Sequence, residues 1–167
     1  IYTLSLHDAL PILVILALKR IYLECGGLEE VFAKGFARDN SVFSAIRYFR
    51  EEFLALPHPT RVEKHLPNVD KGSAAKRINM FLRWMVRSDD LGVDFGLWHR
   101  IPTSALMLPL DVHAANISRR LGILLHPKND RRAVEEVTAY LRRLDLQDPV
   151  KYDFALFGEG VFDGKEM

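Results

Sequence analysis

Two residues of the chain stand where a side chain could take part in chemistry on an anionic substrate. In the segment PLDVHAANISRRLGIL, Asp111 is placed to cap the N-terminus of a helix. The free N–H groups and the dipole of that helix favour an ionised carboxylate. His113 follows in the first turn, where a side chain can contact a phosphate. Both residue types also occur at helix starts for structural reasons alone, so a catalytic and a structural interpretation stay open.

A second segment concentrates positive charge. From Arg61 to Arg87 there are seven Lys and Arg residues against two acidic ones, in a chain whose formal net charge is +1. Within it, KGSAAKRINMFLRWMVR places Lys76, Arg77 and Arg83 on one expected helix. Such a stretch is typical of a phosphate-facing surface, although a solvated basic face gives the same pattern.

The elements that must position these residues are helices. Apolar residues recur at helical spacing along the chain, and no segment alternates like a strand. We therefore expect an all-α fold. The expected helices cover residues 13–25, 28–39, 41–56, 73–87, 111–122, 129–144 and 148–162. Ser73, Asp111 and Asp148 are the expected N-caps of three of them, and Gly122 is an expected C-terminal stop.

These two segments resemble parts of a known enzyme superfamily. PLDVHAANISRRLGIL looks like the VDTHV…R…RLGL segment of helix-hairpin-helix DNA glycosylases, the group of endonuclease III and 8-oxoguanine glycosylase. KRINMFL is similar to the KTANVVL that follows the hairpin there, and YDFALFGEGVF resembles a later helix near the DNA. The separation of 35 residues between Lys76 and Asp111 is closer to the archaeal 8-oxoguanine branch than to endonuclease III.

The resemblance implies a helical bundle of the glycosylase type and a DNA glycosylase/lyase activity on a damaged base, with an oxidised purine as one candidate. It implies that Lys76 is the Schiff-base nucleophile and Asp111 the catalytic aspartate, with no metal and no cofactor. The residues expected to contact DNA are Lys71, Ser73, Arg77, Arg83 and His113. Trp98, in a Gly-rich loop, is either a core residue or a platform for an extruded base.

The chain departs from that superfamily in two ways. The segment LPNVDKG stands where typical members have the hairpin LPGVG, and the four-cysteine cluster is absent because Cys25 is the one cysteine. Lys71, in the turn before the helix, is a rival to Lys76 as nucleophile. Two alternatives to an enzyme remain: a non-catalytic nucleic-acid-binding helical module, and a helical interaction protein with no nucleic-acid partner.

Almost the whole chain from Leu13 onward resembles a bacterial family of unknown function found in Bacteroidetes-type organisms. The resemblance is carried by GGLEEVFAKGF, KGSAAKRINMFLRWMVR, GVDFGLW, PLDVH and QDPVKYDFALFG. The chain is identified as a member of that family. Because the family is itself uncharacterised, the expected activity depends on the glycosylase resemblance.

The first twelve residues, IYTLSLHDALPI, look like a translated adapter oligonucleotide of a sequencing library. We expect residues 1–12 to be an artefact that packs poorly, and residues 13–167 to be one helical domain lacking its N-terminal part. An apolar patch is then expected on the helices of residues 13–56, where the missing part docked.

Composition limits the remaining choices. One cysteine among 167 residues excludes an internal disulfide and a four-cysteine metal site. The apolar run LPILVILAL is far shorter than the roughly 20 residues of a membrane span, and its basic residues follow it instead of preceding it. We expect a cytoplasmic, monomeric protein with DNA as its partner and no membrane association.

Overall fold

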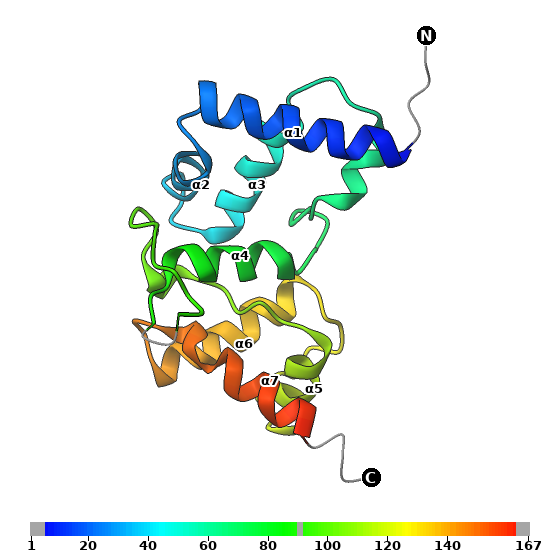
Figure 1. Ribbon diagram of the computed structural model, residues 1–167. Coiled ribbons are helices and arrows are strands. Elements are labelled where there is room, and N and C mark those ends of the chain that lie inside the picture. Colours follow the sequence, from blue (N-terminus) through cyan, green and yellow to red (C-terminus); the bar gives the residue numbers. More distant parts are fainter. Residues whose placement is uncertain (1–5, 90–91, 163–167) are drawn as a thin grey trace. The chain divides into compact units, whose positions relative to one another are not determined.

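The computed structural model describes residues 6–89 and 92–162 (Figure 1). The described part contains α-helices, 3-10 helices and one isolated antiparallel bridge between Ser88 and Phe95, without a strand. The α-helices are α1 Leu6–Glu24, α2 Leu28–Phe36, α3 Val42–Phe53, α4 Lys76–Val86, α5 Val112–Arg120, α6 Arg131–Leu144 and α7 Asp153–Phe162. The 3-10 helices are η1 Thr60–His65, η2 Thr103–Ala105 and η3 Pro149–Tyr152. The predicted all-α class is confirmed.

The chain falls into two compact units, Ile1–Asn68 and Val69–Met167. The expectation of one domain over residues 13–167 stays a prediction. The first unit holds α1, α2, α3 and η1, and the second holds the remaining elements. Every residue expected to do chemistry belongs to the second unit.

The first unit is built on close packing of α2 against α3. A Cβ added at Gly35 of α2 would lie 2.7 Å from the Cβ of Tyr48 and 2.8 Å from the Cα of Ala45, so only glycine permits this approach. The rings of Phe32 and Phe49 stack across the same contact with centroids 4.7 Å apart. Phe43, Ile46, Phe49 and Phe53 form a buried stripe along α3.

Helix α1 starts seven residues before the expected position and contains Pro11. Leu13, Ala17 and Ile21 are buried. A second row of apolar side chains is exposed along the helix: Ile12, Ile15, Leu16, Tyr22 and Leu23. The expected exposed apolar surface in the first unit is therefore present.

We expected residues 1–12 to pack poorly. Most of these residues, Leu4 and Leu6 among them, lie outside those whose side chains are described. Leu10 is half-buried, and Pro11 and Ile12 are exposed.

The core of the second unit forms around α6 and an irregular segment, residues 106–110. Leu106, Leu108 and Leu110 are buried although they lie in no helix. A buried irregular backbone needs hydrogen-bond partners from elsewhere. Thr138 of α6 accepts the N–H of Leu108 at 3.1 Å, and Arg142 donates to the carbonyls of residues 104, 105 and 106. These side chains fix the path that leads from α4 to α5.

The predicted starts of α4 and of the last helix need correction. Helix α4 begins at Lys76, with Ala75 at its N-cap in a left-handed conformation (φ 49°), and Ser73 lies before it. Ser73 instead accepts the N–H of Ala75 at 3.2 Å, which shapes the turn. At the other end of the unit, η3 separates Asp148 from α7, so Asp148 does not cap an α-helix.

Candidate functional site

The amine of Lys76 and the carboxylate of Asp111, 35 residues apart in sequence, lie together. The Nζ of Lys76 is 3.4 Å from the Oδ2 of Asp111. The lysine side chain is 45% exposed and the aspartate side chain 15%, so the pair is open to solvent on the lysine side. The sequence singled out both residues as candidates for the site, and the fold brings their side chains together.

Asp111 is the N-cap of α5, as predicted. Its Oδ1 accepts the N–H of Ala114 at 2.7 Å, which leaves Oδ2 to face Lys76. The capping bond fixes the side-chain rotamer of Asp111. The carboxylate is therefore held in place by its own helix and does not depend on Lys76 for its position.

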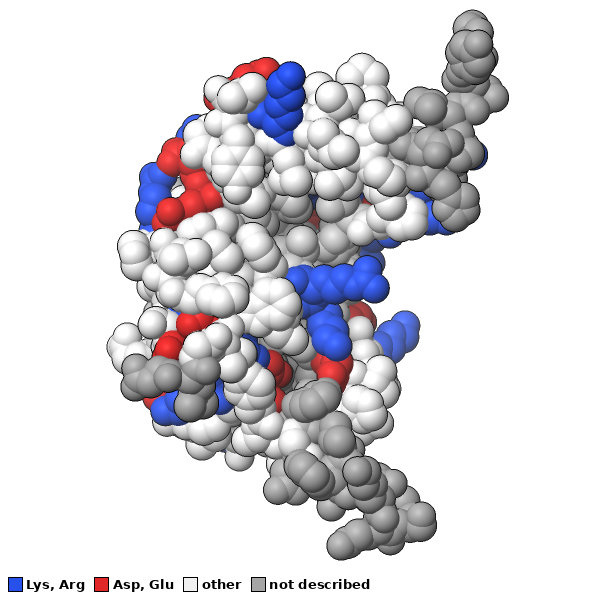
Figure 2. Space-filling model, in the orientation of Figure 1, with Lys and Arg blue, Asp and Glu red and all other residues white. Residues whose placement is uncertain are grey.

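Lys76 and Arg77 open α4, at the end of a helix where positive charge is disfavoured. The first turn of α4 has no acidic residue, and no side chain caps its amides. Ala75 adopts a positive φ that non-glycine residues rarely take. This end of α4 thus combines two cations, uncapped amides and a strained turn, and Asp111 supplies the nearest compensating charge. On the face drawn in Figure 2, Lys and Arg side chains project here with an acidic side chain beside them.

Four of the residues expected to contact DNA remain accessible. Lys71, Arg77 and His113 are exposed, and Ser73 is half-buried. Lys71 belongs to the turn and Lys76 to the helix, and the ion pair with Asp111 joins Lys76, not Lys71, to the carboxylate. The geometry therefore favours Lys76 over its rival.

Arg83, the fifth residue expected to contact DNA, is not accessible. Its side chain is 2% exposed, and its Nε lies 3.1 Å from Asp94 while its Nη1 binds Asp153. Its guanidinium also stacks on the ring of Phe154, 4.3 Å from the centroid. A guanidinium enclosed in this way is not presented to a phosphate, so we remove Arg83 from the DNA-contacting residues.

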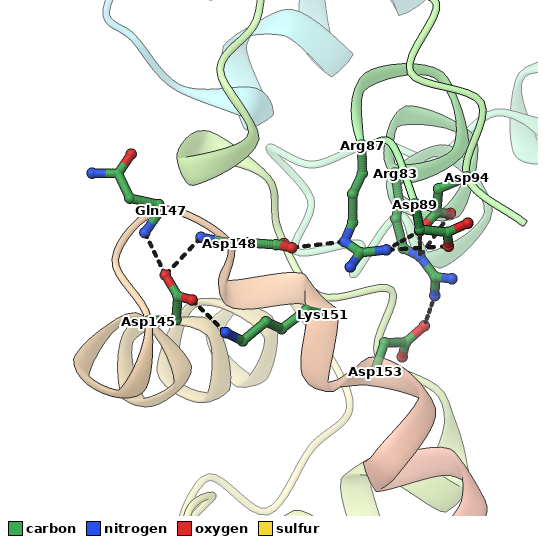
Figure 3. A network of polar contacts seen from close by, with 9 residues as sticks. All are labelled: Arg83, Arg87, Asp89, Asp94, Asp145, Gln147, Asp148, Lys151 and Asp153. Carbon is green, nitrogen blue, oxygen red and sulfur yellow. Dashed lines mark hydrogen bonds and ion pairs between the residues drawn. The ribbon is translucent and has the colours of Figure 1, made fainter. Parts of the chain in front are cut away.

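Arg83 is part of a network of charges that the sequence did not reveal (Figure 3). Arg87, one turn further along α4, binds Asp94 at 2.6 Å, Asp148 at 2.8 Å and Asp89 at 3.4 Å. Two arginines thus face four aspartates. The available signal was two arginines one turn apart on a mostly apolar helix followed by the acidic segment SDDLGVD.

Asp153, the first residue of α7, is the member of the network with a raised pKa. Burial raises the pKa of Asp153 to about 6, against the opposing effect of Arg83. Asp111 raises the same pKa and Lys76 lowers it. Helices α5 and α7 pack together, which brings Asp153 within electrostatic range of the Lys76–Asp111 pair (Figure 1). The charges of the exposed pair therefore influence the pKa of one member of the buried network, Asp153.

Trp98 lies on the inside of the unit. It is 8% exposed and meets Phe81 edge to face, with ring centroids 5.3 Å apart. The backbone N–H of Trp98 donates to the carbonyl of Met85 at 2.8 Å, which ties the Gly-rich loop to α4. This environment fits the interpretation of Trp98 as a core residue better than that of a stacking platform.

Two general properties bear on the site. Among the described residues, no group of three or more His, Cys, Asp and Glu side chains is arranged to hold a metal ion. None of the described helices is both long and apolar enough to cross a membrane.

Comparison with known proteins gives one match. The model of a family described as a protein of unknown function (DUF2400) matches residues 6–162. The match covers nearly the whole chain, including part of the segment that resembles a translated adapter. No curated protein and no solved structure matches the chain.

Proposed function

The chain belongs to the DUF2400 family, and we propose that it is a DNA base-excision glycosylase/lyase. Its nucleophile is Lys76, and its catalytic carboxylate is Asp111. The second unit is a helical bundle related to the helix-hairpin-helix glycosylases, and the substrate is a damaged base, with oxidised purines as the first class to test. A base must leave the stack before a side chain can reach its glycosidic bond.

One observation carries the proposal: the 3.4 Å contact between the Lys76 amine and an Asp111 carboxylate that its own helix holds in place. A lysine nucleophile needs a group to take its proton and, in the transition state, a negative charge beside the developing positive charge on the sugar. Asp111 can serve in both roles in turn: it takes the proton, passes it to the departing base and is then an anion again beside the positive charge of the sugar. Its capping bond keeps it there after Lys76 moves to the substrate.

The chemistry proceeds in three steps. Asp111 takes a proton from the Lys76 ammonium, and the nitrogen lone pair forms a bond to C1′ while the glycosidic bond breaks and its electron pair leaves with the base. The departing base takes the proton that Asp111 accepted, which restores the carboxylate. The nitrogen then gives up a proton, its lone pair opens the sugar ring by breaking the bond from C1′ to O4′, the proton passes to O4′, and the nitrogen becomes an iminium (Schiff base). Loss of a C2′ proton finally expels the 3′-phosphate and cuts the strand.

The start of α4 supports an anionic substrate. Its uncapped amides and the cations of Lys76 and Arg77 attract phosphate, as helix N-termini commonly do. The exposed Lys71 and His113 extend the same region.

A second function remains in view because Lys76 is exposed and ion-paired. An exposed lysine beside a single carboxylate can also contact a phosphate without forming a covalent bond. This observation favours the alternative of a non-catalytic nucleic-acid-binding module. The two functions differ in one measurable property, the formation of a covalent intermediate.

Borohydride trapping measures that property. The protein is incubated with duplex oligonucleotides that each carry one lesion, 8-oxoguanine first, and borohydride reduces any Schiff base to a stable protein–DNA adduct. We expect an adduct with the natural chain, none with Lys76→Gln, and slower base release with Asp111→Asn at nearly unchanged DNA affinity.

Lys34→Gln is the matched control, because Lys34 is also an exposed lysine in a single ion pair, with Glu30. It should trap like the natural chain. If Lys76→Gln still traps and Lys71→Gln does not, the nucleophile is Lys71. If the natural chain traps no lesion, the glycosylase proposal is wrong and the binding module replaces it.

A further inference from the structure

The N-terminal segment of α6 lies beside the turn that leads into α4. The N–H of Arg131 donates to the carbonyl of Gly72 at 2.9 Å, although the two residues are far apart in sequence. Figure 1 shows the start of α6 next to the start of α4. The segment just before and at this start, residues 128–132, has the sequence KNDRR.

Together the two segments concentrate positive charge in the second unit. Residues 71–77 and 128–132 contain six basic residues and one acidic residue, in a chain with a net charge of +1. The basic residues are Lys71, Lys76, Arg77, Lys128, Arg131 and Arg132. All are exposed except Arg131, which is half-buried and paired with Glu135 at 2.8 Å.

The one acidic residue of these segments is engaged by its own helix. Asp130 caps α6, accepting the N–H groups of Arg132 at 2.9 Å and Ala133 at 3.4 Å, and its carboxylate also contacts His126. The hydrogen bond from His126 and the two backbone bonds hold the pKa of Asp130 below its usual value. The amides at the start of α6 are thus already occupied, so an anion binds here through the Lys and Arg side chains.

The centre of this surface is bare. Gly72 has a φ of +84°, and a Cβ added to it would meet nothing within 4 Å. A broad polyanion can therefore approach the backbone of the turn between the two groups of cations. A duplex presents one phosphate charge about every 1.7 Å along its axis, which suits several cations spread over a surface better than a single compact anion does.

We propose that residues 128–132 at the start of α6 and residues 71–77 at the start of α4 form one surface that binds the phosphate backbone of duplex DNA. We call it the Gly72 surface. The proposal rests on the proposed function for the identity of the nucleic acid, and it adds a DNA contact from an element that the glycosylase chemistry does not require.

The test measures binding of the full chain to an undamaged, fluorescently labelled DNA duplex as a function of NaCl concentration. Each phosphate contact that is lost lowers the slope of log K against log salt by about 0.9. We expect the double variant Lys128→Gln/Arg132→Gln to bind more weakly and with a slope smaller by about 2. Each single variant should account for about half of that change.

The control is Lys34→Gln/Arg143→Gln, which removes one exposed lysine and one exposed arginine elsewhere; Arg143 lies at the opposite end of α6. It should leave the slope unchanged. Thermal unfolding of each variant checks that the fold is retained, and Arg132→Lys, which keeps the charge, should restore most of the slope.

Three results decide the proposal. A double variant with the slope of the natural chain, or a control that lowers the slope equally, overturns it. A natural chain that does not bind duplex DNA at low salt also overturns it and directs attention to an acidic protein as the partner. A natural chain that binds with the expected dependence but never traps a lesion supports the Gly72 surface while rejecting the glycosylase activity.

Discussion

Helix α4 carries two kinds of ion pair, and burial separates them. At its start, Lys76 meets one carboxylate and is 45% exposed. Two turns later, Arg83 meets two carboxylates and is 2% exposed. An exposed pair contributes about 0–1 kcal/mol, whereas removing one partner of a buried pair leaves a charge without compensation. The same helix therefore carries an exposed, replaceable cation at one end and a structural one in its interior.

The largest expected effect comes from breaking the buried pair. Arg83→Met removes the cation that Asp94 and Asp153 share, and we expect the free energy of unfolding to fall by about 3–5 kcal/mol. Denaturant unfolding at neutral pH measures the change. Arg77→Met, an exposed arginine of the same helix, is the control and should change stability by less than about 0.5 kcal/mol. A loss below about 1 kcal/mol for Arg83→Met would contradict the comparison.

The next effect concerns the pH dependence of the buried network. Because the pKa of Asp153 is raised from 3.8 to about 6 in the folded chain, the folded state binds a proton more tightly than the unfolded state does. The stability that this proton contributes is present below about pH 4 and is lost as the pH rises through about 6. A shift of about 2 pKa units corresponds to about 3 kcal/mol.

Asp153→Asn measures this contribution, since its amide does not titrate. We expect the stability of the natural chain relative to the variant to fall by up to about 3 kcal/mol between pH 4 and pH 7. Denaturant unfolding at several pH values gives the difference. A difference that stays constant over this range, or that grows with pH, would show that burial does not raise the pKa of Asp153.

A smaller effect tests the carboxylate of the exposed pair. Asp111→Ala removes the cap of α5 and should lower stability by about 1 kcal/mol. Asp111→Asn keeps an acceptor oxygen and should cost less than about 0.5 kcal/mol. Thermal and denaturant unfolding of both variants separate capping from charge. Equal losses in the two variants would mean that the charge, not the cap, stabilises this helix start.

The smallest effect is expected at the lysine itself. Lys76→Met breaks one exposed ion pair and should change the free energy of unfolding by less than about 1 kcal/mol. The change also removes a cation from the N-terminal end of α4, which offsets part of the loss. A loss comparable with that of Arg83→Met would place Lys76 among the structural cations and weaken its assignment as nucleophile.

Local signals in the sequence predicted the features of the site that depend on hydrogen bonds between neighbouring residues. Asp111 caps α5 because a carboxylate at that position accepts the nearby N–H groups, and Gly122 ends the helix with a positive φ of 69°. The start of α4 was predicted less well. Ser73 has the chemistry of a cap, but the buried Asn79 donates to the carbonyl of Ala74 at 3.0 Å and helps fix a turn that delays the helix to Lys76.

The sequence by itself determined the helical class, the capping of α5 and the residue types of the exposed pair, because these depend on neighbours within a turn or two. Only the tertiary structure decided which cations are exposed. Arg83 and Arg77 look alike in the sequence, yet one meets Asp153, 70 residues away, and is buried. The contact of Lys76 with Asp111 across 35 residues is of the same kind. Such contacts depend on how helices pack, and packing is set by the whole core rather than by any local pattern.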